Sequence, residues 1–200
     1  MNLHHLVWRL GSGWRVCSSA VLGGGIGPRD WILNAQVPGG YPRMDPDRHL
    51  AEIAAAEHLT GPGAGLMTAA DVTAYTVAAE DGVTATATCG LGVRGWAAAP
   101  GEHTGTPPRP GTVNIVVTLP VPLSDAALVN AVATATEAKV QALLGAGLDC
   151  SGTPTDSVCV AAPAPEAGPG EPFAGPRSRW GARLARAVHA AVLEGALRQS

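Results

Sequence analysis

The sequence has few aromatic residues, few charges and a single lysine. Phe, Trp and Tyr make up 4% of its 200 residues and charged residues 14%, whereas hydrophobic residues make up 46%. Charge this sparse excludes a charge-driven disordered chain, because so many apolar side chains can fill a core. That core must consist mainly of Ala, Val and Leu. The formal net charge of −3 argues against binding to nucleic acid, which needs a basic surface.

The sequence also lacks a long apolar run. Its alanine-rich segments 126–135 and 182–191 are interrupted by polar or charged residues, well short of the ~20 apolar residues that a bilayer requires. We therefore expect no membrane segment. The N-terminus shows no charged start followed by an apolar stretch and a cleavage site, which predicts no signal peptide. The four cysteines are widely spread, which predicts free thiols and a cytoplasmic protein.

Metal-binding patterns are missing as well. The sequence contains no His-x-x-x-His pair, and His49, His58, His103 and His189 stand in unlike contexts. Cys150 and Cys159 have no second cysteine pair to complete a zinc site. The sequence therefore predicts no metal site and no cofactor.

Strand and helix patterns predict one α/β or α+β domain over residues 1–200. We expect a single layered domain with a mixed β-sheet and about three packed helices. Strands are expected at 15–22, 31–37, 65–72, 75–79, 83–89, 112–119 and 157–161. Helices are expected at 45–59, 125–144 and 178–197, each opened by a capping Asp or Ser. The segments 97–111 and 162–176 are rich in Pro and Gly and predict loops within the domain.

The expected helix 125–144 carries a polar stripe. Asn130, Thr134, Glu137 and Gln141 recur at steps of four, three and four, which places them on one face. Lys139 falls within the opposite, apolar face. One interpretation is an exposed stripe with Lys139 extending past its apolar neighbours to water. The other is a buried helix whose stripe lines a pocket, with Lys139 paired to a carboxylate.

Two further segments are candidates for binding a ligand. Ser19 precedes Gly23, Gly24 and Gly25, and this run lacks both the phosphate-loop and the dinucleotide-binding pattern. It is either a plain turn or a source of backbone N–H groups for an amide oxygen or a phosphate. Arg179 begins a basic stripe on the last expected helix, which is either a solvated face or a contact for an anionic group.

Two aspartates lie beside threonines near predicted strand ends. Asp71 follows Thr68 by three residues, and Asp156 follows Thr153 and Thr155. A carboxylate beside hydroxyls suits a general base or a nucleophile, and it equally suits a turn in which Asp bonds the backbone. The residue pattern leaves both interpretations open.

Several segments together resemble the adenosylcobinamide amidohydrolase family. The segments that carry the resemblance are SSAVLGGGIG (18–27), LNAQV (33–37), GLMTAADV (65–72), GTVNIVV (111–117), PLSDAALVNAVATATEAKVQALLGAG (122–147), GTPTDSVCVA (152–161) and FAGPRSRWGARLARAV (173–188). The resemblance implies an enzyme of cobalamin salvage. Such an enzyme cleaves the amide that joins aminopropanol to the corrin ring of adenosylcobinamide, giving adenosylcobyric acid and 1-amino-2-propanol.

The resemblance does not assign catalytic residues, so their roles are hypotheses from chemistry. Amide hydrolysis needs an attacking oxygen, donors for the oxyanion and an acid for the leaving amine. The attacker is Thr68, or a water held by Asp71 or Asp156. The oxyanion is stabilised by Lys139 or by the backbone of Gly23–Gly25. The candidates for substrate binding are Ser19, Gly23, Gly24, Gly25, Asn114, Asn130, Glu137 and Arg179.

These hypotheses have testable alternatives. If Asp71 is the base, replacing it with Ala should abolish turnover and leave the fold intact. A non-catalytic corrinoid-binding or carrier protein would hold the same ligand without consuming it. A hydrolase of an unrelated small amide would not respond to cobinamide. The sequence implies a small-molecule corrinoid partner and leaves open whether the chain forms a homo-oligomer.

Overall fold

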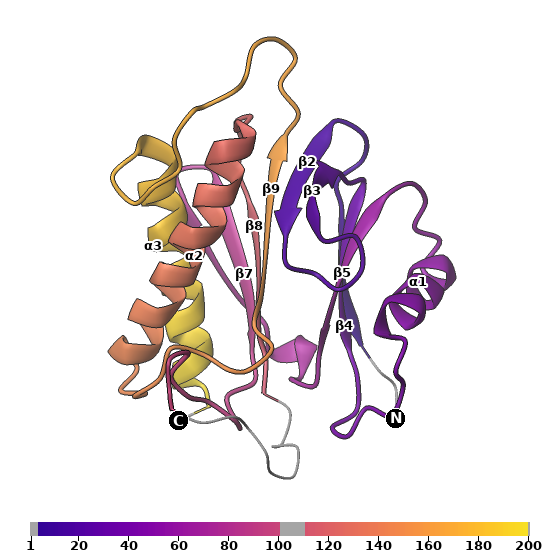
Figure 1. Ribbon diagram of the computed structural model, residues 1–200, viewed down its shortest axis with the longest axis vertical. Coiled ribbons are helices and arrows are strands. Elements are labelled where there is room, and N and C mark those ends of the chain that lie inside the picture. Colours follow the sequence, from indigo (N-terminus) through magenta and orange to yellow (C-terminus); the bar gives the residue numbers. More distant parts are fainter. Residues whose placement is uncertain (1–3, 101–110, 200) are drawn as a thin grey trace.

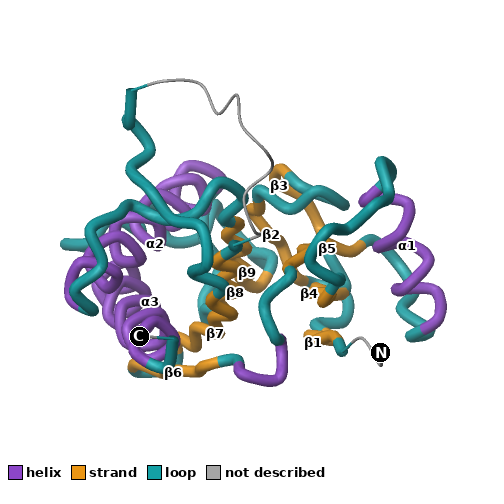
Figure 2. The backbone as a smooth tube through the Cα atoms, turned by 90° about the horizontal axis from the view of Figure 1, so that it is seen from below, coloured by secondary structure: helices purple, strands orange, loops and turns teal. Residues whose placement is uncertain are grey.

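The computed structural model describes residues 4–100 and 111–199. Its elements form four layers, with two helices, a large sheet, a small sheet and one helix following one another across the molecule (Figure 1). Figure 2 shows the same arrangement from below, with α2 and α3 on one side of the strands and α1 on the other. His103 and most of the expected loop 97–111 lie outside the described residues.

The large sheet has six strands in the order β3-β2-β9-β8-β7-β6. Its strands are β2 (Trp14–Ser18), β3 (Gly25–Pro28), β6 (Thr76–Glu80), β7 (Val83–Cys89), β8 (Val113–Thr118) and β9 (Ser157–Pro163). β8 and β9 run parallel, because the long helix α2 (Asp125–Gly145) connects them, and the other neighbours run antiparallel. Asp81 and Gly82 turn the β6–β7 hairpin with positive φ values, as the Asp-Gly pair predicts.

The small sheet has three strands in the order β1-β4-β5. β4 (Trp31–Gln36) pairs antiparallel with β1 (His5–Arg9) and parallel with β5 (Gly63–Thr68). The parallel pair is connected through α1 (Pro46–Ala56), which crosses the outer face of this sheet. A short 3-10 helix, η1 (Val72–Ala74), follows β5.

Apolar side chains fill the three spaces between the four layers. The largest cluster lies between the six-stranded sheet and the helices α2 and α3 (Arg179–Leu197). A second cluster, which includes Ile32, Leu66 and Val116, lies between the two sheets, and a third lies under α1. Alanines are frequent in the largest cluster, so the helices approach the sheet closely, as the scarcity of aromatic residues predicts.

The expected α/β class, the mixed strand directions and the three helices are confirmed. The strands form two stacked sheets, whereas we expected one. The sequence analysis missed β1 and β3. β3 has the sequence GIGP, and its glycines and proline are more typical of a turn than of a strand, so this short edge strand was not predicted. None of the helices in the described part of the chain is long and apolar enough to cross a membrane.

Candidate functional site

A cavity of about 570 Å³ opens at one end of the paired sheets. It lies where β4 and β5 end and where β8 and β9 begin, beside the residue that follows β2. The segment between β4 and α1 covers one side. The lining residues that carry a hydroxyl or a carboxylate are Ser19, Tyr41, Thr68, Thr112, Thr155, Asp156 and Ser157. Apolar residues such as Val21, Val37 and Leu66 make up most of the remaining wall.

Asp156 lies just before β9 and is held by four hydrogen bonds. Its Oδ1 accepts from the backbone N–H of Val113 at 2.8 Å and from the Thr153 hydroxyl at 2.5 Å. Its Oδ2 accepts from the Thr153 N–H at 3.1 Å and from Lys139 Nζ. A carboxylate has about four acceptor positions, so these contacts occupy the group fully. Asp156 therefore joins the start of β8 to the loop that precedes β9.

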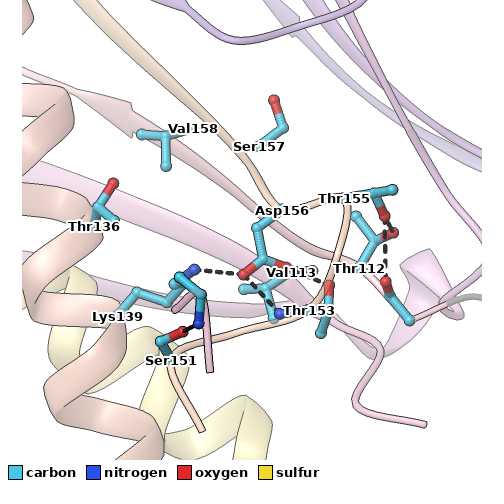
Figure 3. A network of polar contacts seen from close by, with 12 residues as sticks. Thr112, Val113, Thr136, Lys139, Ser151, Thr153, Thr155, Asp156, Ser157 and Val158 are labelled. Atoms are coloured by element: carbon cyan, nitrogen blue, oxygen red, sulfur yellow. Dashed lines mark hydrogen bonds and ion pairs between the residues drawn. The ribbon is translucent and has the colours of Figure 1, made fainter. Parts of the chain in front are cut away.

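Lys139 reaches Asp156 from α2, on the helix side of the six-stranded sheet (Figure 3). The lysine side chain is 8% exposed and that of Asp156 11%, so this ion pair is largely removed from water. Gly152 makes the approach of the two charges feasible, because a Cβ at this position would overlap Asp156 Oδ2 and Lys139 Nζ. The interpretation in which Lys139 pairs with a carboxylate is confirmed.

The side chains of Asp156 and Ser157 leave the chain in opposite directions. Figure 3 shows Asp156 turned toward Lys139 and Ser157 turned away from it, as expected for successive residues of an extended segment. The carboxylate is thus directed to the helix side, and Ser157 to the other face. Asp156 can position the cavity wall, and Lys139 acts on the cavity through Asp156.

Five of the described lining residues are serines and threonines. The Ser19 and Ser157 hydroxyls are 3.0 Å apart, and Ser19 Oγ also accepts from the Val158 N–H at 3.2 Å. The hydroxyls of Thr112 and Thr155 are 2.6 Å apart. On the opposite sheet, Thr68 Oγ1 accepts from the Ala70 N–H at 3.0 Å. Hydroxyl groups from both sheets therefore meet at one site.

A buried amide network links the two sheets next to this site. Asn114 is 1% exposed, and its Nδ2 donates to Asn34 Oδ1 at 2.8 Å and to the Met67 carbonyl at 3.1 Å. Asn34 in turn donates to Thr88 Oγ1 at 3.0 Å. In the part of the chain that the structure describes, the buried Asn114 Oδ1 atom has no hydrogen-bond partner. Asn114 thereby fixes the end of β5, which carries Thr68.

Asp71 lies outside the cavity lining. Its side chain is exposed, and its Oδ1 accepts from both the N–H and the hydroxyl of Thr73 at the start of η1. These hydrogen bonds lower the pKa of the Asp71 carboxyl below its usual range. Asp71 has the geometry of a turn residue that bonds the backbone, the second of the interpretations left open above.

Other predicted ligand-binding residues also lie away from the cavity. Asn130 and Glu137 are exposed on α2, and Arg179 is exposed at the start of α3, where its guanidinium stacks on Trp180. The polar stripe of α2 thus faces solvent, except for Thr134, which donates to the Ala174 carbonyl. The pocket-lining interpretation of this stripe is wrong, because the cavity lies beyond the sheet that α2 covers.

The glycine run forms a turn into an edge strand. Gly23 and Gly25 have positive φ values, and Gly25 begins β3. Gly23 lies against the Gly63 carbonyl at the opposite end of β5 from Thr68. The Gly23 and Gly24 carbonyls accept hydrogen bonds from Arg29. Gly23, Gly24 and Gly25 are not among the residues that line the cavity.

The sequence analysis missed Tyr41, Thr112, Thr155 and Ser157 as lining residues. Tyr41 lies in a glycine- and proline-rich connection, where no local pattern marks a site. Thr112 and Ser157 are the first residues of two predicted strands, and Thr155 lies just before the second of them. They become neighbours only through the pairing of β8 with β9, which a local pattern does not reveal.

The described lining of the cavity contains neither a cysteine nor a set of side chains that could hold a metal ion. All four cysteines are free, and burial raises the pKa of Cys89 and Cys159 to about 12. These two thiols are therefore not thiolates at neutral pH. Among the described residues, no three His, Cys, Asp or Glu side chains come together in a way that could hold a metal ion.

The fold is a layered α/β domain with a cavity lined partly by hydroxyl groups. A family model described as adenosylcobinamide amidohydrolase matches residues 1–200. An adenosylcobinamide amidohydrolase of Methanosarcina mazei is 32% identical over 184 residues, which cover 88% of this chain and 88% of that protein. The chain belongs to the adenosylcobinamide amidohydrolase family, and it is a hydrolase that acts on an amide bond.

Proposed function

We propose that this chain hydrolyses adenosylcobinamide in the cavity at the end of the two sheets. The amide between the corrin ring's propionate arm and aminopropanol is cleaved, giving adenosylcobyric acid and 1-amino-2-propanol for cobalamin salvage in the cytoplasm. The observation that carries the proposal is the convergence of hydroxyl groups from both sheets in this cavity, in a chain of this family.

The size and the wall of the cavity suit one arm of a large substrate. A volume of about 570 Å³ lies within the range of about 300–1,000 Å³ that is typical of small-molecule sites. The apolar wall accepts the propionate methylenes and the aminopropanol carbons, and the hydroxyls face the amide. Val21 lines the cavity and is 52% exposed, so the corrin ring can rest outside on apolar surface.

Thr68 holds the attacking water in this proposal. Its Oγ1 accepts from the Ala70 N–H, which leaves the hydroxyl hydrogen to orient a ligand. Asn114 fixes the position of Thr68 through the Met67 carbonyl. The hydroxyls of Ser19 and Ser157 share one hydrogen between them. The second hydrogen is then available to the oxyanion that forms on the amide carbonyl.

Asp156 and Lys139 serve as positioning residues. Their ion pair connects the start of β8 to the loop before β9. Thr112 directly precedes β8, Thr155 lies in the loop before β9, and Ser157 is the first residue of β9. The ion pair thus keeps three cavity hydroxyls in place, and it affects the substrate indirectly, through the positions of these hydroxyls.

Incubation with adenosylcobinamide tests the proposal. Hydrolysis exposes a new carboxylate, so chromatography should separate an acidic corrinoid from the substrate, with one aminopropanol released per product. Tight binding without product would instead identify a corrinoid carrier. Absence of both binding and product would contradict the assignment of this substrate.

A further inference from the structure

The proposed reaction needs a proton carrier at the cavity. The attacking water must lose a proton, and the leaving amine must gain one. Asp156 and Tyr41 are the titratable side chains among the described lining residues. All four acceptor positions of Asp156 are occupied and its carboxylate is directed toward Lys139. Tyr41 is therefore the better placed of the two.

Tyr41 is joined to a histidine on α1. Its hydroxyl lies 2.9 Å from His49 Nδ1, and the two rings are nearly parallel, at 5°, with centroids 5.6 Å apart. Both side chains are half-buried. The hydroxyl of Tyr41 is thus within hydrogen-bonding distance of an imidazole nitrogen, a group that can accept and return a proton.

Charged neighbours hold the segment that carries Tyr41. Arg43 donates to Asp45 at 2.9 and 2.8 Å and to Glu52 at 2.6 and 3.1 Å. These contacts tie the connection after β4 to the first turns of α1, where the His49 N–H donates to the Asp45 carbonyl. Arg43, Asp45 and Glu52 are the charged groups that act on Tyr41, and their charges are paired with one another.

We propose that Tyr41 and His49 form the proton relay of amide hydrolysis. Tyr41 is the catalytic residue that contacts the reacting atoms, and His49 acts through it. This inference rests on the proposed function and supplies the base and the acid that the reaction still lacks.

The relay conserves protons and electrons. As the water oxygen bonds to the amide carbon, a water proton passes to the Tyr41 oxygen, and the Tyr41 proton passes to His49 Nδ1. The carbonyl electron pair moves onto its oxygen. The tetrahedral intermediate then collapses as the oxyanion electron pair re-forms the C=O bond, and the C–N bond breaks with its electron pair staying on nitrogen. That nitrogen takes the Tyr41 proton, while His49 Nδ1 returns its proton to Tyr41.

The test compares two leaving groups. Wild-type protein, Tyr41→Phe and His49→Asn are assayed on adenosylcobinamide and on a p-nitrophenyl ester of the same corrinoid acid, whose phenolate leaves without protonation. On adenosylcobinamide we expect kcat to fall at least about 100-fold in both variants, with KM nearly unchanged. On the ester the relay no longer has to supply the acid, and the loss should be at least about tenfold smaller. Tyr75→Phe and His189→Asn remove the same groups outside the cavity and should leave both rates unchanged.

Each outcome decides a separate claim. Wild-type rates in Tyr41→Phe would overturn the relay and leave the proposed function intact. Equal losses on both substrates would also overturn it, because a structural role does not depend on the leaving group. If Tyr41→Phe fails to fold, His49→Asn keeps the tyrosine and gives the same contrast. A wild-type protein that forms no acidic corrinoid would overturn the proposed function and the relay together.

Discussion

The loop that carries Asp156 and the loop that carries Asp71 differ in what their carboxylates hold together. Asp156 binds partners on α2, at the start of β8 and in its own loop, and its side chain is 11% exposed. Within the described residues, the Asp71 carboxylate accepts hydrogen bonds from Thr73, two residues away, and the side chain is exposed to water. One loop is fixed by long-range contacts, and the other is fixed by its own backbone.

The difference teaches how this fold builds a rigid wall from a loop. A buried charge is costly to leave unpaired, so we expect the position of the Asp156 loop to depend on Lys139. A local turn carries no such dependence. For this reason we expect substitutions that disturb the Asp156 loop to lower the free energy of unfolding more than a substitution in the Asp71 loop. Three substitutions, taken from the largest expected effect to the smallest, test this difference.

Lys139→Met should have the largest effect. It leaves Asp156 as an uncompensated buried charge, which typically costs about 3–5 kcal/mol of the free energy of unfolding. Turnover should fall with it, because three cavity hydroxyls lose their support. Denaturant unfolding measures the change. Arg186→Met is the matched control, since it breaks the exposed Arg186–Glu80 pair and should cost at most about 1 kcal/mol. Equal losses in the two variants would contradict the ranking.

Gly152→Ala should have an intermediate effect. The added Cβ overlaps Asp156 Oδ2 and Lys139 Nζ, and forcing such a group into a packed site costs about 1–3 kcal/mol. The melting temperature and the unfolding free energy report the change. Gly147→Ala serves as the control, because Gly147 also has a positive φ and nothing lies within 4 Å of a Cβ at that position. A Gly152 variant as stable as the control would show that the pair tolerates displacement.

Asp71→Ala should have the smallest effect and should retain turnover. Because hydrogen bonds from Thr73 lower the pKa of Asp71, its stabilising contribution is present above the ordinary carboxyl pKa. It is lost as the pH falls through the folded-state pKa. The small stability difference from wild type at pH 7 should therefore vanish in acid, once the Asp71 carboxyl is protonated in the folded protein as well. Unfolding midpoints over a pH series from neutral to acid measure it, and loss of turnover would return Asp71 to the mechanism.

Local pattern was sufficient for most of the fold. The helix after Ser124 and the strand 113–118 follow from a cap and from a run of β-branched residues. The edge strand β3 did not follow, because its glycines and proline match a turn equally well. The division into two sheets depends on pairings between distant segments, such as β1 with β4, which local propensity does not determine.

The candidate site was predictable only where its residues have a local signature. Thr68, Asp156, Lys139 and Ser19 were identified from hydroxyl, charge and position, and the structure gathers them at or behind one cavity. Tyr41 lies in a connection without periodicity, and its coupling to His49 arises from the docking of that connection on α1. Asp71 and Asp156 have similar sequence contexts, so their different roles become visible only from their tertiary contacts.

The most direct test of the active-site placement removes one hydroxyl at each end of the segment 68–73. Thr68 lines the cavity and Thr73 lies on the exposed turn, so Thr68→Val and Thr73→Val are matched deletions. We predict that kcat/KM for adenosylcobinamide falls about tenfold to 100-fold in Thr68→Val, as for the loss of a hydrogen bond worth about 1.5–3 kcal/mol, and stays near wild type in Thr73→Val. A larger loss in Thr73→Val, or equal losses, would contradict the placement of the active site in this cavity.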